Sequence, residues 1–452
     1  MIYPRLVLAR DLLCEGGYLF VSIDYNENFN MRSILNQIFG DKGFVGEIYW
    51  ESKTKSQNTS TSFNKLQPKA EMILVYGKRS KMRFNLVKSG EKLYPHVDER
   101  GKYREHVLEL MNANGVRGRS SMVFDITDGV STVSPPEGRQ WQLGQDQVAT
   151  YQEAGDLFIR DGRVVIKMRP GYERSVTTEP FWGFFDKTIG TAESAKKELK
   201  ELLGSHGFET VKPCELVKRL CFHAVDSGEL VLDFFSGSAT TAHAVMQLNA
   251  EDGGSRKFIM VQLPEVCDEK SEAAKAGYKN ICEIGKERIR RAGAKIAAEV
   301  EEGNAQLKLG EDPKPVPDIG FRVLKIDSSN FKDVKSTPDV IQQDALFGMA
   351  DNLKSGRTPE DILFQLFPQF EIPFSARIEK LNICGKAVYS VDDDTLLACF
   401  DAEVPEDVIR AMAERQPLRA VLRDASFIGD DALANFEEIF KTYSPATETR
   451  VV

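Results

Sequence analysis

"VLDFFSGSATTAHAV" occupies residues 231–245, and this stretch decides the fold that the sequence predicts. An apolar run over residues 231–235 leads into a loop of small residues, and an alanine-rich segment with helical spacing follows at once. A buried strand that passes through such a loop into a helix is typical of sheets that bind a ligand at the carboxyl ends of their strands. Gly237 favours ligand binding by this loop, because a residue without Cβ lets the backbone approach a ligand closely.

Polar side chains around this loop indicate what it binds. Ser238, Thr240 and Thr241 supply hydroxyls, which are also expected to cap the following helix. The next predicted strand lies in "RKFIMVQLPE", so Glu265 is expected at the neighbouring strand end, where a carboxylate accepts hydrogen bonds from two ribose hydroxyls. The pattern predicts an adenosine-containing ligand. The alternative is an ordinary strand–helix turn with a solvated glutamate.

The number of glycines distinguishes between such ligands. A dinucleotide site requires G-x-G-x-x-G, whereas this loop has Gly237 alone and places Ala239 where a second glycine would stand. A pyrophosphate needs exposed amides and a close approach of the backbone. The loop therefore favours a ligand without phosphates, S-adenosylmethionine, over NAD or FAD.

Apolar periodicity along the chain predicts an α/β protein with an interrupted core. Helix-like and strand-like segments alternate over residues 1–81 and again over 186–310, which indicates a mostly parallel sheet covered by helices. Residues 82–185 lose this rhythm and contain short strand-like pieces among Gly, Pro and Ser clusters, so we expect an inserted domain there. The proline-rich "EDPKPVPD" (311–318) predicts a linker to a small α+β domain over residues 319–452.

Composition disfavours several classes of protein. The 452 residues are 42% hydrophobic and 28% charged, and no apolar run reaches the roughly 20 residues that cross a bilayer. The first residues lack a basic-then-apolar signal order, so the cytoplasm is the predicted location and no membrane is expected. The seven cysteines form no C-x-x-C pair and the five histidines have no metal-ligand spacing, so no metal site is expected.

Several motifs, in the order in which they occur, resemble those of one enzyme family. Residues 231–265 are similar to the cofactor motif of the β-class DNA amino-methyltransferases and, more closely, of the modification subunits of type III restriction–modification systems. "TVKPCELVKRL" (210–220) resembles the family's Lys-Pro motif, which packs beside the methionine half of the cofactor. "YPRLVLARDLLCEGGYLFVSIDYNE", "GYKNICEIGKERIRRA" and "GFRVLKIDSSNF" are also similar to stretches of these subunits, so the resemblance covers nearly the whole chain.

The resemblance implies S-adenosylmethionine as cofactor and a Rossmann-like methyltransferase sheet in permuted order. In the β-class, the catalytic half precedes the target-recognition region and the cofactor half comes last, which agrees with a glycine loop after residue 230. The residues predicted to bind the cofactor are Asp233, Phe235, Ser236, Gly237, Ser238, Thr240, Glu265 and Lys212. The resemblance further implies adenine-N6 methylation of double-stranded DNA, with a restriction subunit of helicase character and a second modification subunit (a homodimer) as partners.

The family's catalytic motif, Asp-Pro-Pro-Tyr, does not occur in the sequence. In the family, the Asp carboxylate and a Pro carbonyl accept hydrogen bonds from the adenine amino group and direct its lone pair toward the methyl group, while the aromatic ring stacks on the flipped base. "VSPPEG" (133–138) has adjacent prolines but no acid before them and no aromatic residue after them. We therefore expect the motif upstream of Met1, no catalytic residue in this chain, and little methylation by the chain alone.

Local charge predicts where DNA would bind, although the formal net charge is −9. Basic residues outnumber acids between residues 78 and 119, and a phosphate backbone responds to local potential. Arg117, Arg119, Lys167 and Arg169 are the predicted DNA contacts of the insert, because arginine reaches guanine edges and lysine neutralises phosphates. A solvated basic surface is the alternative for these residues.

Other questions stay open in the sequence. Asp24 follows the predicted strand in "YLFVSID" and either faces the same crevice or caps the next helix. The acidic last domain is a candidate docking surface for a partner. For the whole chain, the alternatives to a methyltransferase are a non-catalytic DNA-binding remnant that provides target specificity and an unrelated nucleotide-dependent oxidoreductase.

Overall fold

The computed structural model describes the chain except residues 1, 56–62, 64–65, 79–81, 209, 309, 333–352 and 428–429. The chain divides into two compact units, Met1–Gly320 and Phe321–Val452, and each is described by itself. The division lies just beyond the predicted linker at 311–318. Among the described residues, no helix has both the length and the apolar character that a membrane span requires.

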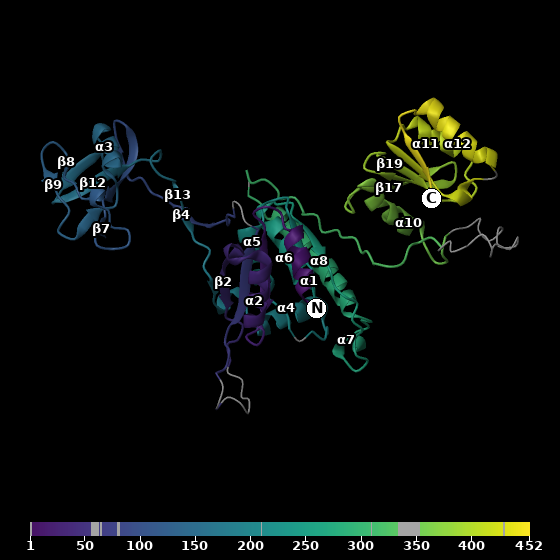
Figure 1. The fold of residues 1–452 in the computed structure, drawn as a ribbon, viewed down its shortest axis with the longest axis horizontal. Coiled ribbons are helices and arrows are strands. Elements are labelled where there is room, and N and C mark those ends of the chain that lie inside the picture. The colour runs from purple at the N-terminus through teal and green to yellow at the C-terminus, as the bar shows by residue number, and fades with distance from the viewer. Residues whose placement is uncertain are drawn as a thin grey trace. The chain divides into compact units, whose positions relative to one another are not determined.

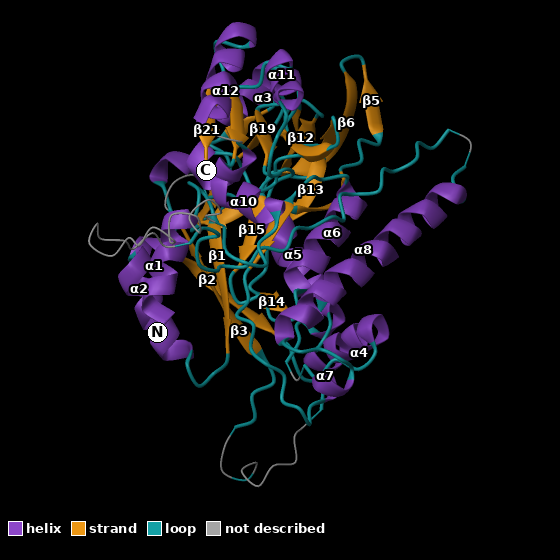
Figure 2. Ribbon diagram, turned by 90° about the vertical axis from the view of Figure 1, so that its right-hand side faces the viewer, coloured by secondary structure: helices purple, strands orange, loops and turns teal. Residues whose placement is uncertain are grey.

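The first sheet of the N-terminal unit has the strand order β1-β3-β2-β14. Its strands are β1 (Tyr18–Ile23), β2 (Phe44–Trp50), β3 (Glu71–Gly77) and β14 (Phe184–Phe185), and the helices that pack on it are α1 (Ile2–Leu12), α2 (Asn28–Phe39) and α5 (Cys214–Ala224). The helices α1 and α2 lie beside the sheet (Figure 2), and their Leu6 and Leu35 pack in one cluster with residues of one face. Ile73 and Val75 point to the other face, because side chains alternate along a strand, and there they join a cluster with Leu216 of α5. The sheet is therefore a buried layer between helices.

The prediction of a mostly parallel sheet is wrong for this part of the chain. β1 and β2, which α2 connects, run in the same direction, but β3 lies between them and is antiparallel to both. A parallel neighbour requires a crossover connection, usually a helix. The described residues between Trp50 and Glu71 contain no helix, so β3 returns in the opposite direction. Within this sheet only the β2–β14 pair is parallel.

A separate parallel pair, β15 and β16, forms the other part of the core. The elements here are α4 (Ala192–Leu203), β15 (Leu230–Asp233), α6 (Thr240–Asp252), β16 (Lys257–Met260), α7 (Glu272–Lys275) and α8 (Ile281–Ala305). The helix α6 connects the two strands, and its Val245 and Leu248 pack in one cluster with Val231 and Phe258. Because α8 also packs on α6, most of α6 is buried. The loop between β15 and α6 therefore leads from a partly exposed strand into a buried helix.

Between β3 and β14 the chain forms an insert of short strands. Two of them, β4 (Val87–Glu91) and β13 (Val176–Glu179), pair antiparallel where the chain leaves and returns (Figure 1). The other elements are β5 (His96–Asp98), β6 (Gly101–Val107), β7 (Leu110–Asn112), β8 (Ile126–Thr127), β9 (Thr132–Val133), β10 (Arg139–Trp141), α3 (Gln145–Glu153), β11 (Leu157–Arg160) and β12 (Arg163–Met168). Trp141, Val148 and Ile166 belong to its core. β14, at the end of the segment that the sequence analysis assigns to the insert, pairs with β2 of the first sheet.

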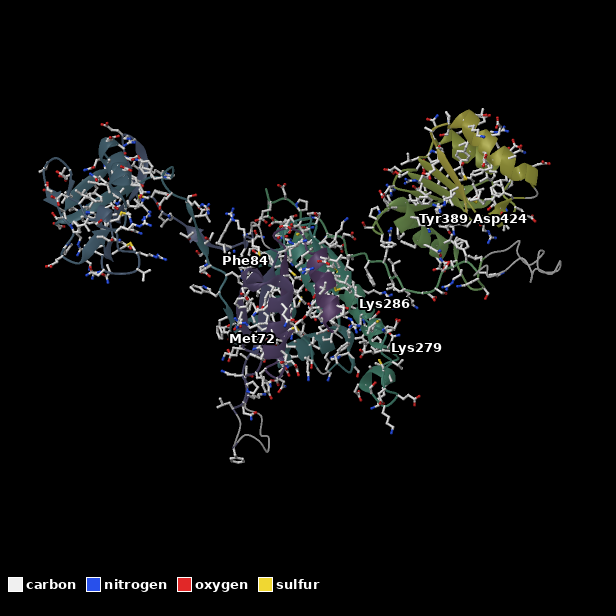
Figure 3. The ribbon with its side chains drawn as sticks, viewed as in Figure 1. Met72, Phe84, Lys279, Lys286, Tyr389 and Asp424 are labelled. Carbon is white, nitrogen blue, oxygen red and sulfur yellow. The ribbon has the colours of Figure 1, made fainter. Side chains whose placement is uncertain are left out.

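The C-terminal unit contains a five-stranded sheet with helices on both faces. Its elements are α10 (Pro359–Leu366), β17 (Ile378–Ile383), β18 (Lys386–Val391), β19 (Leu396–Cys399), α11 (Glu406–Glu414), β20 (Arg419–Leu422), α12 (Asp430–Tyr443) and β21 (Glu448–Val451). The helix α10 packs in one apolar cluster and α11 with α12 in another. Tyr389 of β18 (Figure 3) donates a 2.9 Å hydrogen bond to Glu360 of α10. The pairs β17–β18 and β18–β19 are antiparallel, and β19–β20 and β20–β21 are parallel, so the sheet is mixed.

Candidate functional site

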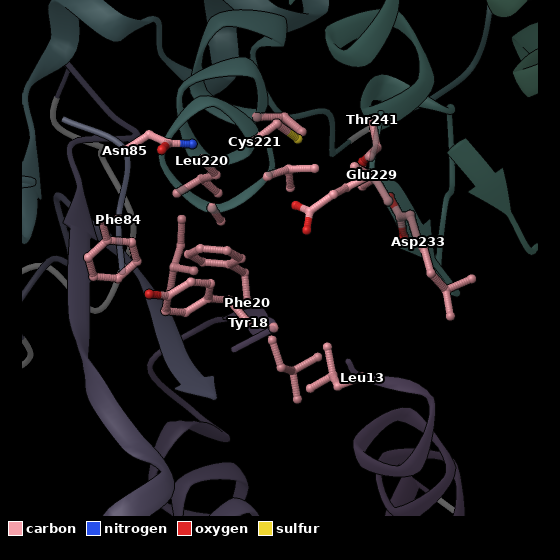
Figure 4. Close-up of a pocket in the computed structure, with 18 of the residues that line it drawn as sticks. Leu13, Tyr18, Phe20, Phe84, Asn85, Leu220, Cys221, Glu229, Asp233 and Thr241 are labelled. Atoms are coloured by element: carbon pink, nitrogen blue, oxygen red, sulfur yellow. The ribbon is translucent and has the colours of Figure 1, made fainter. Parts of the chain in front are cut away.

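A cavity of about 2030 Å³ opens between the first sheet and the β15–β16 pair. Its lining includes residues of α1, all of β1, part of α5, β15 and the loop after β15. Leu13, Tyr18 and Phe20 lie on one side, and Glu229 and Asp233 lie across the cavity from them (Figure 4). Sites for small ligands usually measure about 300–1,000 Å³. The space is therefore larger than a single cofactor would fill.

Asp233, the last residue of β15, holds the start of the loop. Its Oδ2 accepts a 2.6 Å hydrogen bond from the Thr241 hydroxyl, and its Oδ1 accepts one of 3.2 Å from the Phe235 N–H. These bonds join the strand end to the first turn of α6. Asp233 and the exposed ring of Phe235 both line the cavity. The structure thus brings these two predicted residues together at one wall.

Gly237 lies in the middle of the loop in a conformation that favours glycine. Its φ is +50°, a left-handed value that a side chain disfavours. Its N–H donates a 2.8 Å hydrogen bond to Oε1 of Gln262, which follows β16 closely. Sequence reasoning missed Gln262 because it chose the acid in "QLPE" and passed over the amide three residues earlier. The position of Gln262 just beyond a strand end was the signal that could have identified it.

The loop hydroxyls do not cap α6, contrary to the sequence prediction. Ala239 occupies the N-cap position, and no described side chain accepts a hydrogen bond there. Ser238 and Thr240 instead accept hydrogen bonds of 3.1 and 2.7 Å from Nη1 of Arg288 in α8. The physical reason is the left-handed conformation of Ala239, which has φ 59° and ψ 38° and takes the place where a capping side chain would act. Ser236, Ser238 and Thr240 are buried and line the cavity.

Behind the loop lies a buried cluster of charged and titratable groups. Arg288 is 0% exposed, and its Nη2 donates a 3.2 Å hydrogen bond to Oε1 of Glu198 in α4. Nδ1 of His243 lies 3.7 Å from the same oxygen. Burial and, to a smaller extent, the positive charge of Arg288 together lower the pKa of His243 to about 3. The imidazole is therefore neutral near pH 7.

This cluster has the residue types of a metal site but already contains a cation. Glu198, Cys214 and His243 offer atoms that lie within 4.8 Å of one another. Burial raises the pKa of the Cys214 thiol to about 12, which disfavours the thiolate that binds metals. The Arg288 guanidinium supplies the positive charge that the Glu198 carboxylate requires. The arrangement therefore favours an internal ion pair.

The remaining predicted residues lie in different surroundings. Lys212 lines the cavity, and its Nζ lies 3.2 Å from Oε2 of Glu71. Glu265 is exposed beyond β16 and is not among the described residues that line the cavity. Asp24 accepts hydrogen bonds from the N–H groups of Asn26 and Glu27 in a turn ahead of α2. The N-cap of α2 is Glu27, and Asp24 is not among the described residues that line the cavity, so neither alternative of the sequence analysis describes it.

Two strand edges face the cavity. On the side of β15 that faces β16, the N–H of Lys257 donates to the carbonyl of Glu229 at 2.9 Å, and the N–H of Val261 donates to the carbonyl of Asp233 at 2.8 Å. Because the bonding direction alternates along a strand, the backbone groups of Leu230 and Leu232 point to the opposite edge, and both residues line the cavity. β1 is the terminal strand of its sheet and pairs only with β3 among the described strands. Both edges thus border the same space.

In the insert, two of the predicted DNA contacts are engaged within the protein. Arg169 is 7% exposed and donates hydrogen bonds to the carboxylates of Asp98 and Asp156. Nζ of Lys167 lies 3.0 Å from Asp98 and over the ring of Tyr103. Hydrogen bonds from Arg169 and Lys167 hold the pKa of Asp98 well below its usual range. Arg169 therefore holds this network together and is not placed on the surface as the sequence prediction assumed.

Arg117 and Arg119 have a different environment. Both are exposed, in the segment between β7 and β10. The side chain of Gln140, which is 2% exposed, donates to the carbonyl of Arg117 at 3.1 Å and accepts from the N–H of Arg119 at 2.7 Å. One buried amide thus fixes the backbone at both arginines while their side chains stay at the surface.

The sequence of the chain is similar to those of known DNA methyltransferases. Residues 1–290 match the N6_N4_Mtase family, described as DNA methylase. The chain is 36% identical over 316 residues to the Mod subunit of the type III restriction–modification enzyme StyLTI of Salmonella typhimurium, covering 68% of this chain and 46% of that protein. It is 30% identical over 339 residues to the EcoP15I Mod subunit of Escherichia coli, covering 65% and 50%. It is 27% identical over 303 residues to the type II methyltransferase M.KpnI of Klebsiella pneumoniae, covering 63% and 71%. The chain spans about half the length of the Mod subunits that it matches.

Proposed function

The chain belongs to the N6_N4_Mtase family of DNA methylases, and on this premise we propose that its loop at residues 233–241 binds S-adenosylmethionine for methyl transfer to a DNA base. The observation that supports the proposal most is the position of this loop. It follows a parallel strand at the carboxyl end, and Asp233, Phe235, Ser236 and Gly237 line one wall of a large cavity. A loop with one glycine suits a ligand without phosphates better than a dinucleotide.

The residues of the chain would bind and orient the cofactor, which supplies an activated methyl group when bound. The exposed ring of Phe235 offers an aromatic face for the adenine. Lys212 lines the same cavity and would pair with the carboxylate of the methionine half. Glu265 stays the predicted partner of the ribose hydroxyls, and Gln262 is the polar side chain that contacts the loop itself.

The substrate and partners of the proposed enzyme follow from the family resemblance and the relatives. We propose adenine-N6 in double-stranded DNA as the methyl acceptor, within a type III system that includes a restriction subunit and a second modification subunit. Exposed Arg117 and Arg119 are the proposed DNA contacts of the insert. Such a protein would act in the cytoplasm, where the DNA of a bacterium lies.

The catalytic Asp-Pro-Pro-Tyr motif, which the 452 residues do not contain, would require a further strand. The space between β1 and β15 supports this proposal because the outward backbone groups of Leu230 and Leu232 and the outer edge of β1 border it. An extended segment placed there would hydrogen-bond to both edges and would bring its end to the loop. The chain alone would then bind the cofactor without methylating DNA.

Isothermal titration tests the cofactor proposal directly. The chain is expected to bind S-adenosylmethionine and not NAD. G237L should weaken binding at least about tenfold, because the side chain is strained at positive φ and fills the loop where the backbone approaches the ligand. G253L is the matched control, since Gly253 also has positive φ (73°) but ends α6 at the opposite end. Equal affinity of G237L and the unsubstituted chain would contradict the site.

A non-catalytic DNA-binding function is the second candidate, favoured by the absence of Asp-Pro-Pro-Tyr from the 452 residues. Transfer of a tritiated methyl group to DNA distinguishes the two. The chain is expected to transfer none alone and to gain activity when mixed with a strand-forming polypeptide that carries Asp-Pro-Pro-Tyr. Binding of DNA with no binding of S-adenosylmethionine would favour the second candidate.

A further inference from the structure

We infer that Arg288 is a positioning residue that holds the loop around Ala239 in its ligand-binding conformation, an inference that rests on the proposed function. Ser238 and Thr240 line the cavity, whereas Arg288 is not among the described residues of the lining. Arg288 reaches the loop from α8, on the side away from the cavity, and it would act on a ligand only through the residues that it binds.

The hydrogen bonds of Arg288 bracket one strained residue. Its Nη1 donates to Oγ of Ser238 at 3.1 Å and to Oγ1 of Thr240 at 2.7 Å. Ala239 lies between these two residues and has the left-handed conformation, with φ 59° and ψ 38°. A residue with a Cβ keeps this conformation only when its surroundings impose it. The guanidinium imposes it by fixing the residue on either side.

The helix that carries Arg288 also touches the loop directly. One turn earlier in α8, Gly285 lies so close that a Cβ built there would be 3.4 Å from the Gly237 carbonyl oxygen and 3.5 Å from Cβ of Ala239. Contacts at positions 285 and 288 place one face of the helix against the loop. The conformation of the loop, and with it the direction of the Gly237 backbone, therefore depends on α8.

The interactions of Arg288 differ from those of an arginine that only stabilises the fold. Its Nε has no hydrogen-bond partner among the described residues, although the side chain is fully buried. Its one carboxylate partner, Glu198, is 36% exposed, so water can hydrate that group if the arginine is removed. The buried partners that depend on Arg288 are the two loop hydroxyls. Replacement of Arg288 by methionine, which has a similar shape, should therefore affect the loop more than the fold.

A double-mutant cycle tests the inference. R288M is expected to weaken binding of S-adenosylmethionine about tenfold, because Ala239 then leaves the left-handed conformation in the free chain. In the A239G background the same substitution should weaken binding less than about threefold, because glycine adopts positive φ without help. The matched control is R291M, because Arg291 lies on the same helix with its side chain 47% exposed. Thermal unfolding of each variant shows whether it folds.

The outcomes separate this inference from the proposed function. If the unsubstituted chain does not bind S-adenosylmethionine, the proposed function is wrong, and hydrogen exchange of the loop amides in the free chain still tests Arg288. Faster exchange at residues 237–241 in R288M, and not in R291M, supports the inference. Unchanged exchange and affinity in R288M would overturn it. An equal loss of affinity in the R288M and R288M/A239G variants would also overturn it, because Arg288 would then not act through Ala239.

Discussion

Arg169 and Arg288 are both buried in the N-terminal unit, and they are paired in different ways. Arg169 in the insert is surrounded by the carboxylates of Asp98 and Asp156, and its hydrogen bonds to both raise its pKa above the ordinary value. Arg288 behind the loop has one carboxylate partner and two hydroxyl partners, and burial lowers its pKa. The first joins parts of the insert to each other. The second joins a helix to a loop at the cavity.

The comparison shows that burial of an arginine does not define its function. Arg169 satisfies two carboxylates, and the side chain of Asp156 is 0% exposed. The carboxylate beside Arg288 is 36% exposed and would keep contact with water without its partner. A buried charge without a partner is destabilising, whereas a hydrated one is not. Loss of Arg169 should therefore affect stability, and loss of Arg288 should affect the site.

Replacement of Arg169 gives the largest expected effect. R169M should lower the free energy of unfolding of the insert by about 3 kcal/mol, the lower end for breaking a buried ion pair, because Asp98 and Asp156 lose their shared partner and keep only Lys167 and Arg100. R288M should lower the stability of its own region by only about 1 kcal/mol, comparable with the loss of a hydrogen bond. Urea-dependent hydrogen exchange of β12 and α6 measures the two regions separately, and R163M, at an exposed position of β12, is the control. Equal destabilisation by R169M and R288M would contradict the expectation that Arg169 stabilises the fold and that Arg288 acts mainly on the site.

The second prediction concerns pH, because the two regions contain different titrating groups. The pKa of His243 is about 3 in the folded chain and 6.5 ordinarily, so unfolding takes up a proton below pH 6.5 and stability falls as the pH decreases from 6.5 toward 3. At pH 5 the loss near α6 should be about 2 kcal/mol. H243Q should remove this loss, and H96Q, at an exposed residue of the insert, should not.

The insert should respond to acid in a lower pH range. Hydrogen bonds from Arg104 lower the pKa of Glu173 to about 2 from 4.5, despite the opposing effect of burial. Its contribution is present above pH 4.5 and is lost as the pH falls toward 2. After correction for the intrinsic exchange rate, the protection of amides in α6 should therefore be lower at pH 5 than at pH 7, and the protection in β12 should be unchanged. Lower protection in β12 alone would contradict the assignment of both groups.

A third prediction compares the residue that the sequence singled out with the one that the structure places at the loop. Q262A should weaken binding of S-adenosylmethionine by about 1–2 kcal/mol, because the Gly237 N–H loses its acceptor. E265A should weaken it less, because Glu265 is exposed, whereas Gln262 contacts the loop; neither residue is among the described residues that line the cavity. Titration calorimetry measures both. A larger effect of E265A, of roughly 2–4 kcal/mol for two ribose hydrogen bonds to a charged group, would favour the sequence prediction.

The smallest expected effect comes from the exposed arginines of the insert. R117A and R119A should each reduce the salt dependence of DNA binding by about one phosphate contact without changing thermal stability. R163A removes the same charge from an exposed position elsewhere on the insert and should leave the salt dependence unchanged. If R163A and R117A act alike, these residues form a diffuse basic surface and no defined contact.

Local signals in the sequence predicted the elements well and their pairing less well. The helix α4 begins after Thr191, whose hydroxyl caps it, and ends at Gly204, so both of its ends follow from neighbouring residues in the sequence. The direction of β3 was not predictable in the same way, because it depends on the connection after Trp50 and not on the apolar pattern of the strand.

The candidate site was predictable where one segment forms it. Asp233, Phe235, Ser236 and Gly237 follow each other along the chain and line the cavity together. Arg288 comes from a helix about 50 residues later, in a segment whose charges suggest a solvated face, and only packing shows that it is buried. For Arg169 the sequence predicted a DNA contact at the surface, whereas the side chain is buried. Composition cannot distinguish an exposed arginine from one that is enclosed by carboxylates.

The measurement that tests the central claim most directly is hydrogen exchange of the chain with and without S-adenosylmethionine. We expect the ligand to slow exchange at residues 233–241 and at the neighbouring residues 259–263, and NAD to have no effect there. No protection of the segment 233–241, or the same protection by NAD, would contradict the account.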